Sequence, residues 1–265
     1  MMNKILLTLL ALAALLLTAC DEISPEERLT YVEPSEVNRA VLIEDYTGQY
    51  CVNCPRATQE IERLVEEYGD SIVIAVAIHS GPFGKQKGEP SPLYTELGDL
   101  YFNNWGLSAQ PVGLVDRLFN SMPFSYTDWG AGVNYEIASN APVSFLTTAS
   151  IDDAHHASIE VQTIGMDSVM VSGKLQVWLV EDSIDSFQYM PDGSVDQHYM
   201  HMHVLRASVN GPWGDAVSVS HGEVVRKNYD LNVEDDWVPE HCSLVTFLYD
   251  ENGVRQVSKT KLIHN

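Results

Sequence analysis

The chain has 265 residues, 37 of them acidic and 15 basic, and its formal net charge is −22. This excess of negative charge argues against nucleic acid as a partner and against attraction to anionic membrane headgroups. Hydrophobic residues make up 45% of the chain, which excludes a disordered acidic polymer and leaves material for one large or two modest domains.

The first residues have the features of a secretion signal. Lys4 supplies a positive charge, and Ile5 to Leu17 form an apolar run too short for a dedicated transmembrane span. Leu17-Thr-Ala-Cys20 has the form of a lipobox. Residues 1–19 are therefore predicted to be a lipoprotein signal peptide, and acylation of Cys20 to anchor the mature chain to a membrane. The alternative is ordinary cleavage that leaves Cys20 as a spare thiol.

Residues 20–39 are predicted to be an acidic tether that lifts the folded part off the membrane. The segment mixes acidic residues with Pro25 and Pro34 and has no sustained apolar period. Asp21 and Glu22 follow the lipidated position. An Asp there resembles an inner-membrane retention signal of enterobacteria, and acidic residues there resemble a surface-export signal of Bacteroidetes. The sequence therefore leaves the membrane leaflet open.

Residues 40–141 show alternating strand and helix patterns. A short apolar strand is predicted at residues 40–43, an amphipathic helix follows and ends at Gly69, and a second apolar strand covers residues 72–78. A strand, a helix and a strand of these lengths predict a βαβ unit with parallel strands. The other elements predicted for this α/β domain are helices near residues 93–101 and 127–139 and a strand at residues 112–115.

From Val143 the apolar pattern changes from the helical period of about 3.6 to the strand period of about 2 residues. Short alternating runs such as Ile159–Gln162 are separated by turn residues such as Asp192-Gly193. One of the predicted strands runs from Tyr199 to Ala207. Together these strands indicate that residues 142–265 form an all-β sandwich domain of immunoglobulin-like type.

Cys51-Val-Asn-Cys54 is the most informative motif, because it lies between a predicted strand and a predicted helix. Two thiols in this place can act as a dithiol/disulfide couple, and the helix N-terminus favours thiolate at Cys51. The alternative is a permanent disulfide that pins the junction. The remaining cysteine, Cys242, is predicted to be buried and inert, the alternative being a resolving or partner-bonding thiol.

This arrangement resembles the thioredoxin fold over residues 40–141. The resemblance implies that Cys51 is the exposed nucleophile and Cys54 the buried resolving cysteine. Asp45, six residues before Cys51, matches a buried acid that assists proton transfer at Cys54, the alternative being an acid exposed to water at the strand end. Pro111 matches the family's cis-proline beside the disulfide.

Two departures from thioredoxin limit what carries over. Val52-Asn53 replaces the Gly-Pro between the cysteines, so the redox potential of thioredoxin is not transferred. The segment from Ser80 to Ala109 is longer than in a minimal thioredoxin. The fold class expected from the pattern and the resemblance together is an α/β thioredoxin-like domain followed by an all-β immunoglobulin-like sandwich domain.

Over nearly its whole length the chain also resembles lipoproteins of Bacteroidetes related to outer membrane protein 28. The segments from Leu42 to Pro55 and from His203 to Ser208 carry this resemblance. It implies a lipid anchor in the outer membrane, on the periplasmic face or at the cell surface, with a thioredoxin-like domain and a C-terminal β-domain.

Two functions are alternatives at this point. The preferred one is thiol–disulfide exchange on protein thiols and disulfides outside the cytoplasm, with Cys51, Cys54, Asp45 and Pro111 forming the site. The other is a surface-exposed outer-membrane lipoprotein with a binding or structural role, in which Cys51–Cys54 is a structural disulfide.

No cofactor and no metal site is expected. A structural zinc site needs about four ligands, and no second Cys-x-x-Cys or nearby His pair accompanies Cys51 and Cys54. His201 and His203 would share one face of a predicted strand. They are expected to be hydrogen-bonded or solvated, the alternative being a shared metal ion.

Overall fold

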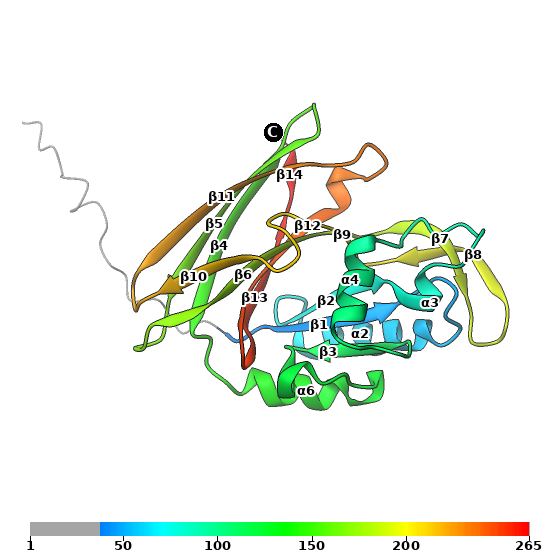
Figure 1. Ribbon diagram of the computed structural model, residues 1–265, viewed down its shortest axis with the longest axis horizontal. Helices are drawn as coiled ribbons and strands as arrows, with labels where there is room; N and C mark the ends of the chain where they lie inside the picture. The colour runs from blue at the N-terminus through cyan, green and yellow to red at the C-terminus, as the bar shows by residue number, and fades with distance from the viewer. Residues whose placement is uncertain (1–37, 265) are drawn as a thin grey trace, which may run out of the picture. The chain divides into compact units, whose positions relative to one another are not determined.

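A computed structural model describes residues 38–264, which belong to one compact unit. The predicted signal peptide, Cys20 and nearly all of the predicted tether lie outside the described residues. The helices lie mainly in the first half of the described chain (Figure 1). The elements of that half are β1 (Val41–Thr47), α2 (Cys54–Tyr68), β2 (Val73–His79), α3 (Gly81–Gly84), α4 (Glu96–Asn104), β3 (Val112–Val115), α5 (Leu118–Ser121), η1 (Tyr126–Asp128) and α6 (Trp129–Ile137).

The second half is built almost entirely of strands. Its elements are β4 (Val143–Ile151), β5 (His156–Gly165), β6 (Val171–Glu181), β7 (Ile184–Tyr189), β8 (Val195–His201), β9 (Val204–Ser208), β10 (Asp215–Val219), β11 (Val224–Asn232), η2 (Pro239–His241), β12 (Cys242–Asp250), β13 (Gly253–Lys261) and β14 (Ile263–His264).

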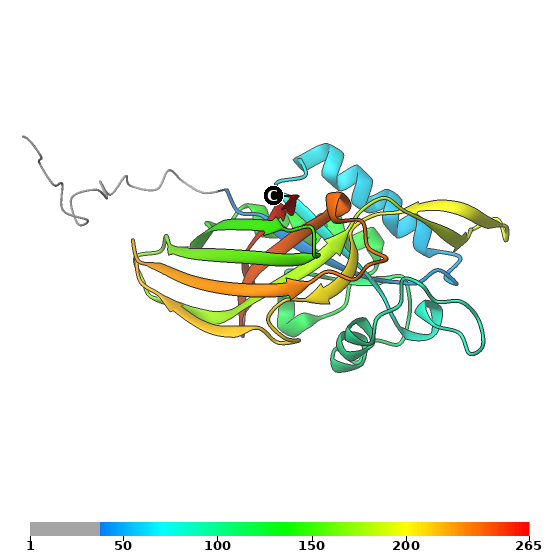
Figure 2. The same cartoon turned by 90° about the horizontal axis from the view of Figure 1, so that it is seen from above.

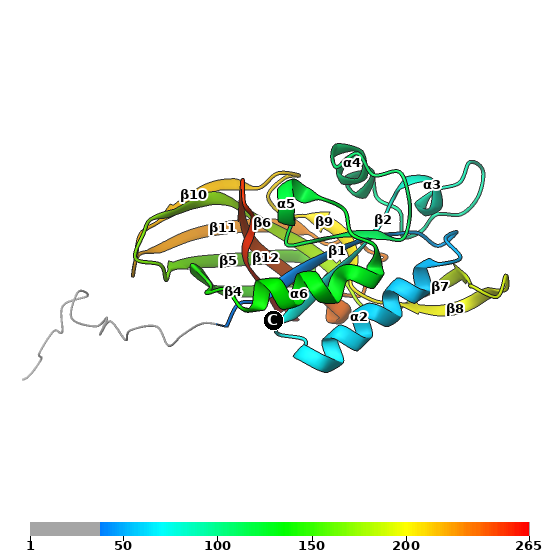
Figure 3. The ribbon, with the colours of Figure 1, turned by 90° about the horizontal axis from the view of Figure 1, so that it is seen from below.

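The predicted βαβ unit is confirmed, because β1 and β2 are parallel neighbours and α2 connects them. Ala57, Ile61 and Leu64 recur at helical spacing and form the buried face of α2. Gly69 ends the helix with a φ of 95°, a backbone conformation that glycine adopts without strain. Figure 3 shows α2 and α6 across one face of β1 and β2. On the other face, α4 packs against β2.

Strands from both halves of the chain form one eight-stranded sheet. Seven of them follow the order β13-β12-β6-β9-β2-β1-β3, and β10 pairs with β6. The join between the halves is narrow, because β2 and β9 are paired only at Ala77 and Val204.

The predicted fold class, an α/β thioredoxin-like domain followed by an immunoglobulin-like sandwich domain, is therefore wrong. The described chain is mostly β, and residues 40–141 contribute only β1, β2 and β3 to a sheet whose other strands come from residues after 142. The physical reason is that an apolar run shows that a strand is buried but does not show which strand pairs with its edge. The free edge of β2 is met by β9, from the other half. The predicted domain boundaries stay predictions.

A four-stranded sheet of order β11-β5-β4-β14 packs on part of the large sheet. Ile159 and Val161 of the small sheet join a buried apolar cluster with Val177 and Leu179 of β6. Trp178, between those two residues of β6, points to the opposite face and belongs to another cluster. The continuous apolar run of β6 is thus explained by burial on both faces.

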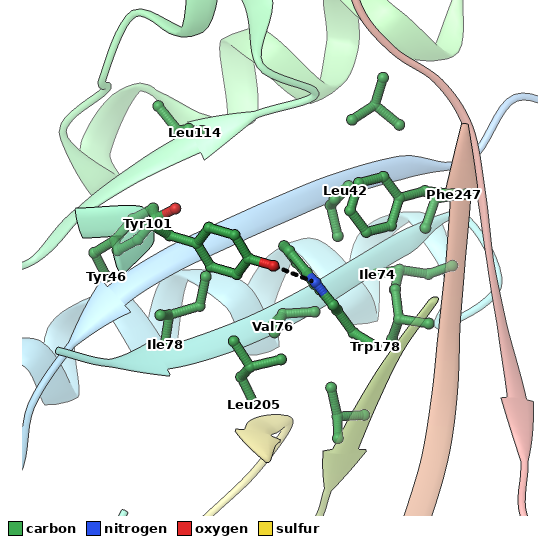
Figure 4. Packing of buried hydrophobic residues seen from close by; sticks show 14 of the residues in the cluster. Leu42, Tyr46, Ile74, Val76, Ile78, Tyr101, Leu114, Trp178, Leu205 and Phe247 are labelled. Carbon is green, nitrogen blue, oxygen red and sulfur yellow. Dashed lines mark hydrogen bonds between the residues drawn. The ribbon is translucent and has the colours of Figure 1, made fainter. Parts of the chain in front are cut away.

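That other cluster, here called the central core, lies between the helix-rich half and strands β6 and β12 (Figure 4). Within this core, Tyr101 of α4 is hydrogen-bonded to β6, because the Trp178 indole N–H donates to the Tyr101 hydroxyl at 3.0 Å. The Tyr101 hydroxyl in turn donates to the Pro212 carbonyl at 2.7 Å. The labelled members of the central core are Leu42, Tyr46, Ile74, Val76, Ile78, Tyr101, Leu114, Trp178, Leu205 and Phe247.

Two buried arginines form ion pairs in the helix-rich half, and one of them also bonds to β13. Arg39 Nη2 lies 2.6 Å from an Asp116 carboxylate oxygen and donates to the Val254 carbonyl of β13 at 2.6 Å. Arg117 Nε lies 2.6 Å from Glu44 Oε1, and both side chains are nearly fully buried. Burial raises the pKa of Asp116 to about 7, although the nearby Arg39 charge opposes that shift. Arg39 thus connects the helix-rich half to β13, whereas the Arg117–Glu44 pair lies within the helix-rich half itself.

Strands β7 and β8 form a separate antiparallel hairpin between β6 and β9. The hairpin extends from the rest of the strands alongside the start of α2 (Figures 2 and 3). The prediction of one strand from Tyr199 to Ala207 is wrong in its extent, because Met202 and His203 are not in a strand and separate β8 from β9. His203 has a φ of 58°, which ends β8 and turns the chain into β9.

Candidate functional site

Cys51 and Cys54 form a disulfide at the junction of β1 and α2. Cys54 is the first residue of α2, and Pro55 occupies the first turn, where a missing N–H costs no helical hydrogen bond. The loop before the helix is tightly held, because the Cys51 N–H donates to the Gly48 carbonyl at 3.0 Å. A Cβ at Gly48 would collide with the Phe83 backbone, so this turn requires glycine.

The disulfide is buried. The relative exposure of Cys51 and of Cys54 is 2% each, whereas Val52 between them is 42% exposed. The sequence resemblance implied an exposed nucleophile at Cys51, and the structure places that side chain under cover. A partner disulfide therefore has no direct path to the sulfur of Cys51 in this conformation.

The cover is the β7–β8 hairpin, residues 184–201. Gln188 is buried, and its amide N–H donates to the carbonyls of Cys51 at 3.0 Å and Gly48 at 3.3 Å. The Tyr189 N–H donates to the Gln49 carbonyl at 2.9 Å. The hairpin is thus attached to the backbone of the cysteine loop itself.

Side-chain contacts reinforce the same attachment. The Tyr50 ring packs on Phe187 and Tyr189, with ring centroids 5.2 and 5.4 Å apart. The Gln49 amide donates to the Phe187 carbonyl and to the Ser186 hydroxyl, both at 2.9 Å. Nothing in the sequence pattern of residues 184–201 pointed to a partner so far away in the chain.

Asp45 and Cys54 line one small cavity of about 50 Å³ beneath the disulfide. Asp45 is 1% exposed, and its Oδ1 has no hydrogen-bond partner within residues 38–264. Burial raises the pKa of Asp45 to about 8, so a proton on this carboxyl is favoured near neutral pH. Of the two readings of Asp45 from sequence, the buried acid fits this geometry, and its role in proton transfer stays a prediction.

Three histidines line the same cavity, His79, His201 and His203, and the sequence did not single out His79 with the other two. His79 of β2 and His201 of β8 pack edge to face, with ring centroids 5.2 Å apart. Burial lowers the pKa of His201 to about 4 and that of His79 well below its usual value. Both rings are therefore neutral at pH 7. The period-2 pattern of β2 could have placed His79 on the face of Asp45, but only the fold could add His201.

Pro111 follows a cis peptide bond after Gln110. The Gln110 amide donates to the carbonyls of Thr47 at 2.6 Å and Ser80 at 2.8 Å, which ties the segment to the ends of β1 and β2. The next residue, Val112, begins β3 and pairs with Tyr46 of β1. Pro111 thus lies near the end of β1 from which the cysteine loop leaves, and its part in a reaction stays a prediction.

The structure also places His201, His203 and Cys242. His201 contacts the Phe187 carbonyl at 3.3 Å, whereas His203 Nδ1 lies 2.8 Å from Asp182, so the two histidines have separate partners. Cys242 is free and 0% exposed, and burial raises the pKa of its thiol to about 12. In the described part of the chain, no three His, Cys, Asp or Glu side chains are grouped to hold a metal ion. None of the helices within residues 38–264 is long and apolar enough to cross a bilayer.

The family described as "Outer membrane protein Omp28" matches residues 98–265. No curated protein matches the chain. HBP35 of Porphyromonas gingivalis is similar in structure, with a TM-score of 0.63 and 14% identity over 86% of this chain and 77% of that chain. A domain of the outer membrane lipoprotein Omp28 from Porphyromonas gingivalis is 23% identical over 47% of this chain and 91% of that chain, with a TM-score of 0.35. The first similarity shows a shared fold, and the second is too weak to show even that.

Proposed function

We propose that this chain, which belongs to the outer membrane protein Omp28 family, is a lipid-anchored protein with a binding or structural role and a structural Cys51–Cys54 disulfide. Its location is the outer membrane, as the family description says. Cys20 is the proposed attachment point for the lipid, because it stands at the lipobox position.

One observation carries the structural assignment of the disulfide. Both cysteines are 2% exposed under a hairpin that donates hydrogen bonds to the Cys51 and Gln49 carbonyls. A cysteine that attacks partner proteins must meet the partner's sulfur in line, which needs access to solvent. A buried disulfide that holds a strand–helix junction and a docked hairpin needs none.

The extent of the family match supports the same proposal. It covers residues 98–265, and so includes all of the strand-rich half but neither Cys51 nor Cys54. Membership of the family therefore does not depend on the cysteine pair. The matched part of the chain contains strands β4 to β14, and their sheets supply broad surface for binding.

The test of this proposal is turnover of insulin disulfides by the full-length protein after reduction, with dithiothreitol as the electron source. We expect no turnover above the rate of dithiothreitol alone, and the same result for Cys51→Ser. Turnover by the wild type that is lost in Cys51→Ser would refute the structural assignment. Loss of membrane association in Cys20→Ala, measured by fractionation, tests the anchor separately.

Thiol–disulfide exchange is the second candidate, and a specific arrangement favours it. Cys54 begins α2 and shares a cavity with the buried Asp45 carboxyl, which has an unpaired oxygen. In the reaction, Cys51 thiolate attacks a partner disulfide and forms a mixed disulfide, releasing one partner thiolate. Cys54 thiolate then attacks Cys51 and releases the second partner thiolate, so the partner gains two electrons and Cys51–Cys54 is oxidised. An external dithiol must supply the electrons for each further cycle.

Exchange of this kind requires displacement of the hairpin from the cysteine loop. Gln188→Ala removes the side-chain hydrogen bonds to the Cys51 and Gly48 carbonyls, whereas Gln197→Ala, on the exposed part of β8, leaves the cover intact. If exchange is the function, insulin turnover should rise in Gln188→Ala and stay unchanged in Gln197→Ala. Absence of turnover in all three proteins would eliminate this candidate.

A further inference from the structure

A cleft of about 560 Å³ lies where the two halves of the large sheet separate. β9 pairs with β2 only at Val204 and Ala77, so the first residues of β2 have no strand on that side among the described elements. The space between β2 and strands β12 and β13 is the cleft. Its volume falls in the range of about 300–1,000 Å³ that is typical of small-molecule sites.

Backbone groups of β2 point into this cleft. Alternate residues of a strand in a parallel ladder direct their N–H and C=O groups to the same side. The Ala77 N–H points away from β1, because it donates to the His203 carbonyl at 2.8 Å. Ala75, two residues earlier, points the same way and lines the cleft, where no strand of the described chain receives its N–H. That N–H is a donor without a strand partner.

Two side chains add donors on the opposite wall. Ser243 of β12 and Lys261 of β13 are directly opposite each other in the antiparallel ladder, so they project from the same face. Ser243 is 0% exposed, and its hydroxyl has no hydrogen-bond partner within the described chain. Lys261 is exposed, lines the cleft and forms no ion pair with any residue from 38 to 264.

The other charged groups of the cleft are already paired, apart from Asp70, an exposed carboxylate at its rim. Asp182 accepts hydrogen bonds from Lys259 Nζ at 3.0 Å and from the His203 N–H at 2.7 Å. Although burial alone raises the pKa of Asp182, His203 and Lys259 hold it below its usual value. Asp182 is therefore a satisfied anion, and Lys261 is the cation of the cleft that forms no ion pair with the described residues.

We propose that this cleft binds a small organic monocarboxylate with an apolar body. Lys261, the Ser243 hydroxyl and the Ala75 N–H supply donors for one carboxylate, and a single unpaired lysine matches a single negative charge. Val73, Phe145 and Val257 supply apolar wall for the rest of the molecule. Because the net charge of the chain is −22, an unpaired cation inside a cleft is the local attraction that an anion requires.

Octanoate is the probe for this proposal, with octanamide as an uncharged molecule of the same length. The protein is the full chain with Cys20→Ala, so that no attached acyl chain competes, and binding is measured by isothermal titration calorimetry. We expect saturable 1:1 binding of octanoate and at least about tenfold weaker binding of octanamide, since a hydrogen bond to a charged group contributes about tenfold or more. Absence of saturable octanoate binding, or equal affinity for octanamide, would overturn the proposal.

Variants separate a binding role from a structural one. Lys261→Gln should weaken octanoate binding at least about tenfold, whereas Lys174→Gln, an exposed lysine on β6 outside the cleft, should leave it unchanged. Ser243→Ala should weaken binding while keeping or raising the melting temperature, because it removes a buried hydroxyl that has no partner. Unchanged affinity in Lys261→Gln would refute the site. The cleft does not include Cys51 or Cys54, so these outcomes are independent of the disulfide tests.

Discussion

Removing the Cys51–Cys54 disulfide tests its structural role quantitatively. The two cysteines have a sequence separation of 3, so the disulfide closes a loop of about four residues. The chain-entropy relation for a loop of about this length gives about 2 kcal/mol of stabilisation at 25 °C. Both side chains are 2% exposed, so replacement by alanine also leaves small voids that cost on the order of 1 kcal/mol. The double variant Cys51→Ala/Cys54→Ala is therefore expected to lose about 2–3 kcal/mol.

Urea denaturation monitored by circular dichroism measures this loss of unfolding free energy directly, and thermal denaturation measures the matching change in melting temperature. For a folded unit of about 150–250 residues, the expected fall in melting temperature is about 4–12 °C. Val52→Ala/Asn53→Ala is the matched control, because it changes the same loop, keeps the disulfide and alters only exposed side chains. Its free energy of unfolding should stay within about 0.5 kcal/mol of the wild type. A loss in the cysteine variant no larger than in this control would refute the structural role.

Three further predictions concern the buried groups around the site. Arg117→Met should lower the free energy of unfolding by about 3–5 kcal/mol, because Glu44 then stays buried without its partner. Gly48→Ala should cost about 1–3 kcal/mol in urea denaturation, because the added Cβ meets the Phe83 backbone. Asp45→Asn should become steadily more stable relative to the wild type as pH rises from about 4 to about 8. The folded protein keeps a proton on Asp45 up to a pKa of about 8, whereas the unfolded chain releases it near pH 4 and is favoured as pH rises.

Each of these predictions has its own control. The double variant Arg117→Met/Glu44→Gln should recover much of the loss, and no recovery would show that the ion pair is not the cause. Gly88→Ala is the control for Gly48→Ala, because nothing lies within 4 Å of the Cβ added at Gly88. It tests whether crowding by Phe83 causes the loss of stability in Gly48→Ala. Because Gly88 has a φ of 85°, any loss of stability in Gly88→Ala reports backbone strain alone. A stability difference between Asp45→Asn and the wild type that does not vary with pH would contradict the raised pKa.

The sequence predicted most strands and helices of this chain but not how they are arranged. The βαβ unit was predictable, because the apolar period and Gly69 set its limits within a few chain positions. The pairing of β2 with β9 was not, since it joins residues more than a hundred positions apart through a single backbone contact at Ala77 and Val204. The fold class depended on the pairing of β2 with β9. The spacing of apolar residues along the chain contains no information about that pairing.

The candidate site shows the same limit at the level of side chains. Cys51 and Cys54 could be placed from their spacing at the junction of a strand and a helix, and the resemblance to thioredoxins added Asp45. Gln188 and His201 could not, because their strands β7 and β8 alternate weakly and are largely exposed. Polar residues on a predicted exposed hairpin usually face solvent. Only the tertiary structure shows that these residues cover the disulfide.

The hairpin of β7 and β8 also determines when the disulfide can meet a partner protein. It is inserted between β6 and β9, two strands that are anchored in the central core and paired with each other. Lifting it from Cys51 need not disturb that pairing, because β7 and β8 hydrogen-bond only to each other among the strands described. The cost of exposure then comes from the contacts of residues 184–201 with the cysteine loop, with the cavity of Asp45 and His79, and with Thr58 of α2 through Tyr199. Hydrogen exchange at the Tyr189 amide, which donates to the Gln49 carbonyl, measures that opening free energy. Exchange as slow as that of β6 would mean that the disulfide opens only when the whole fold does, whereas much faster exchange would give a partner repeated access to Cys51.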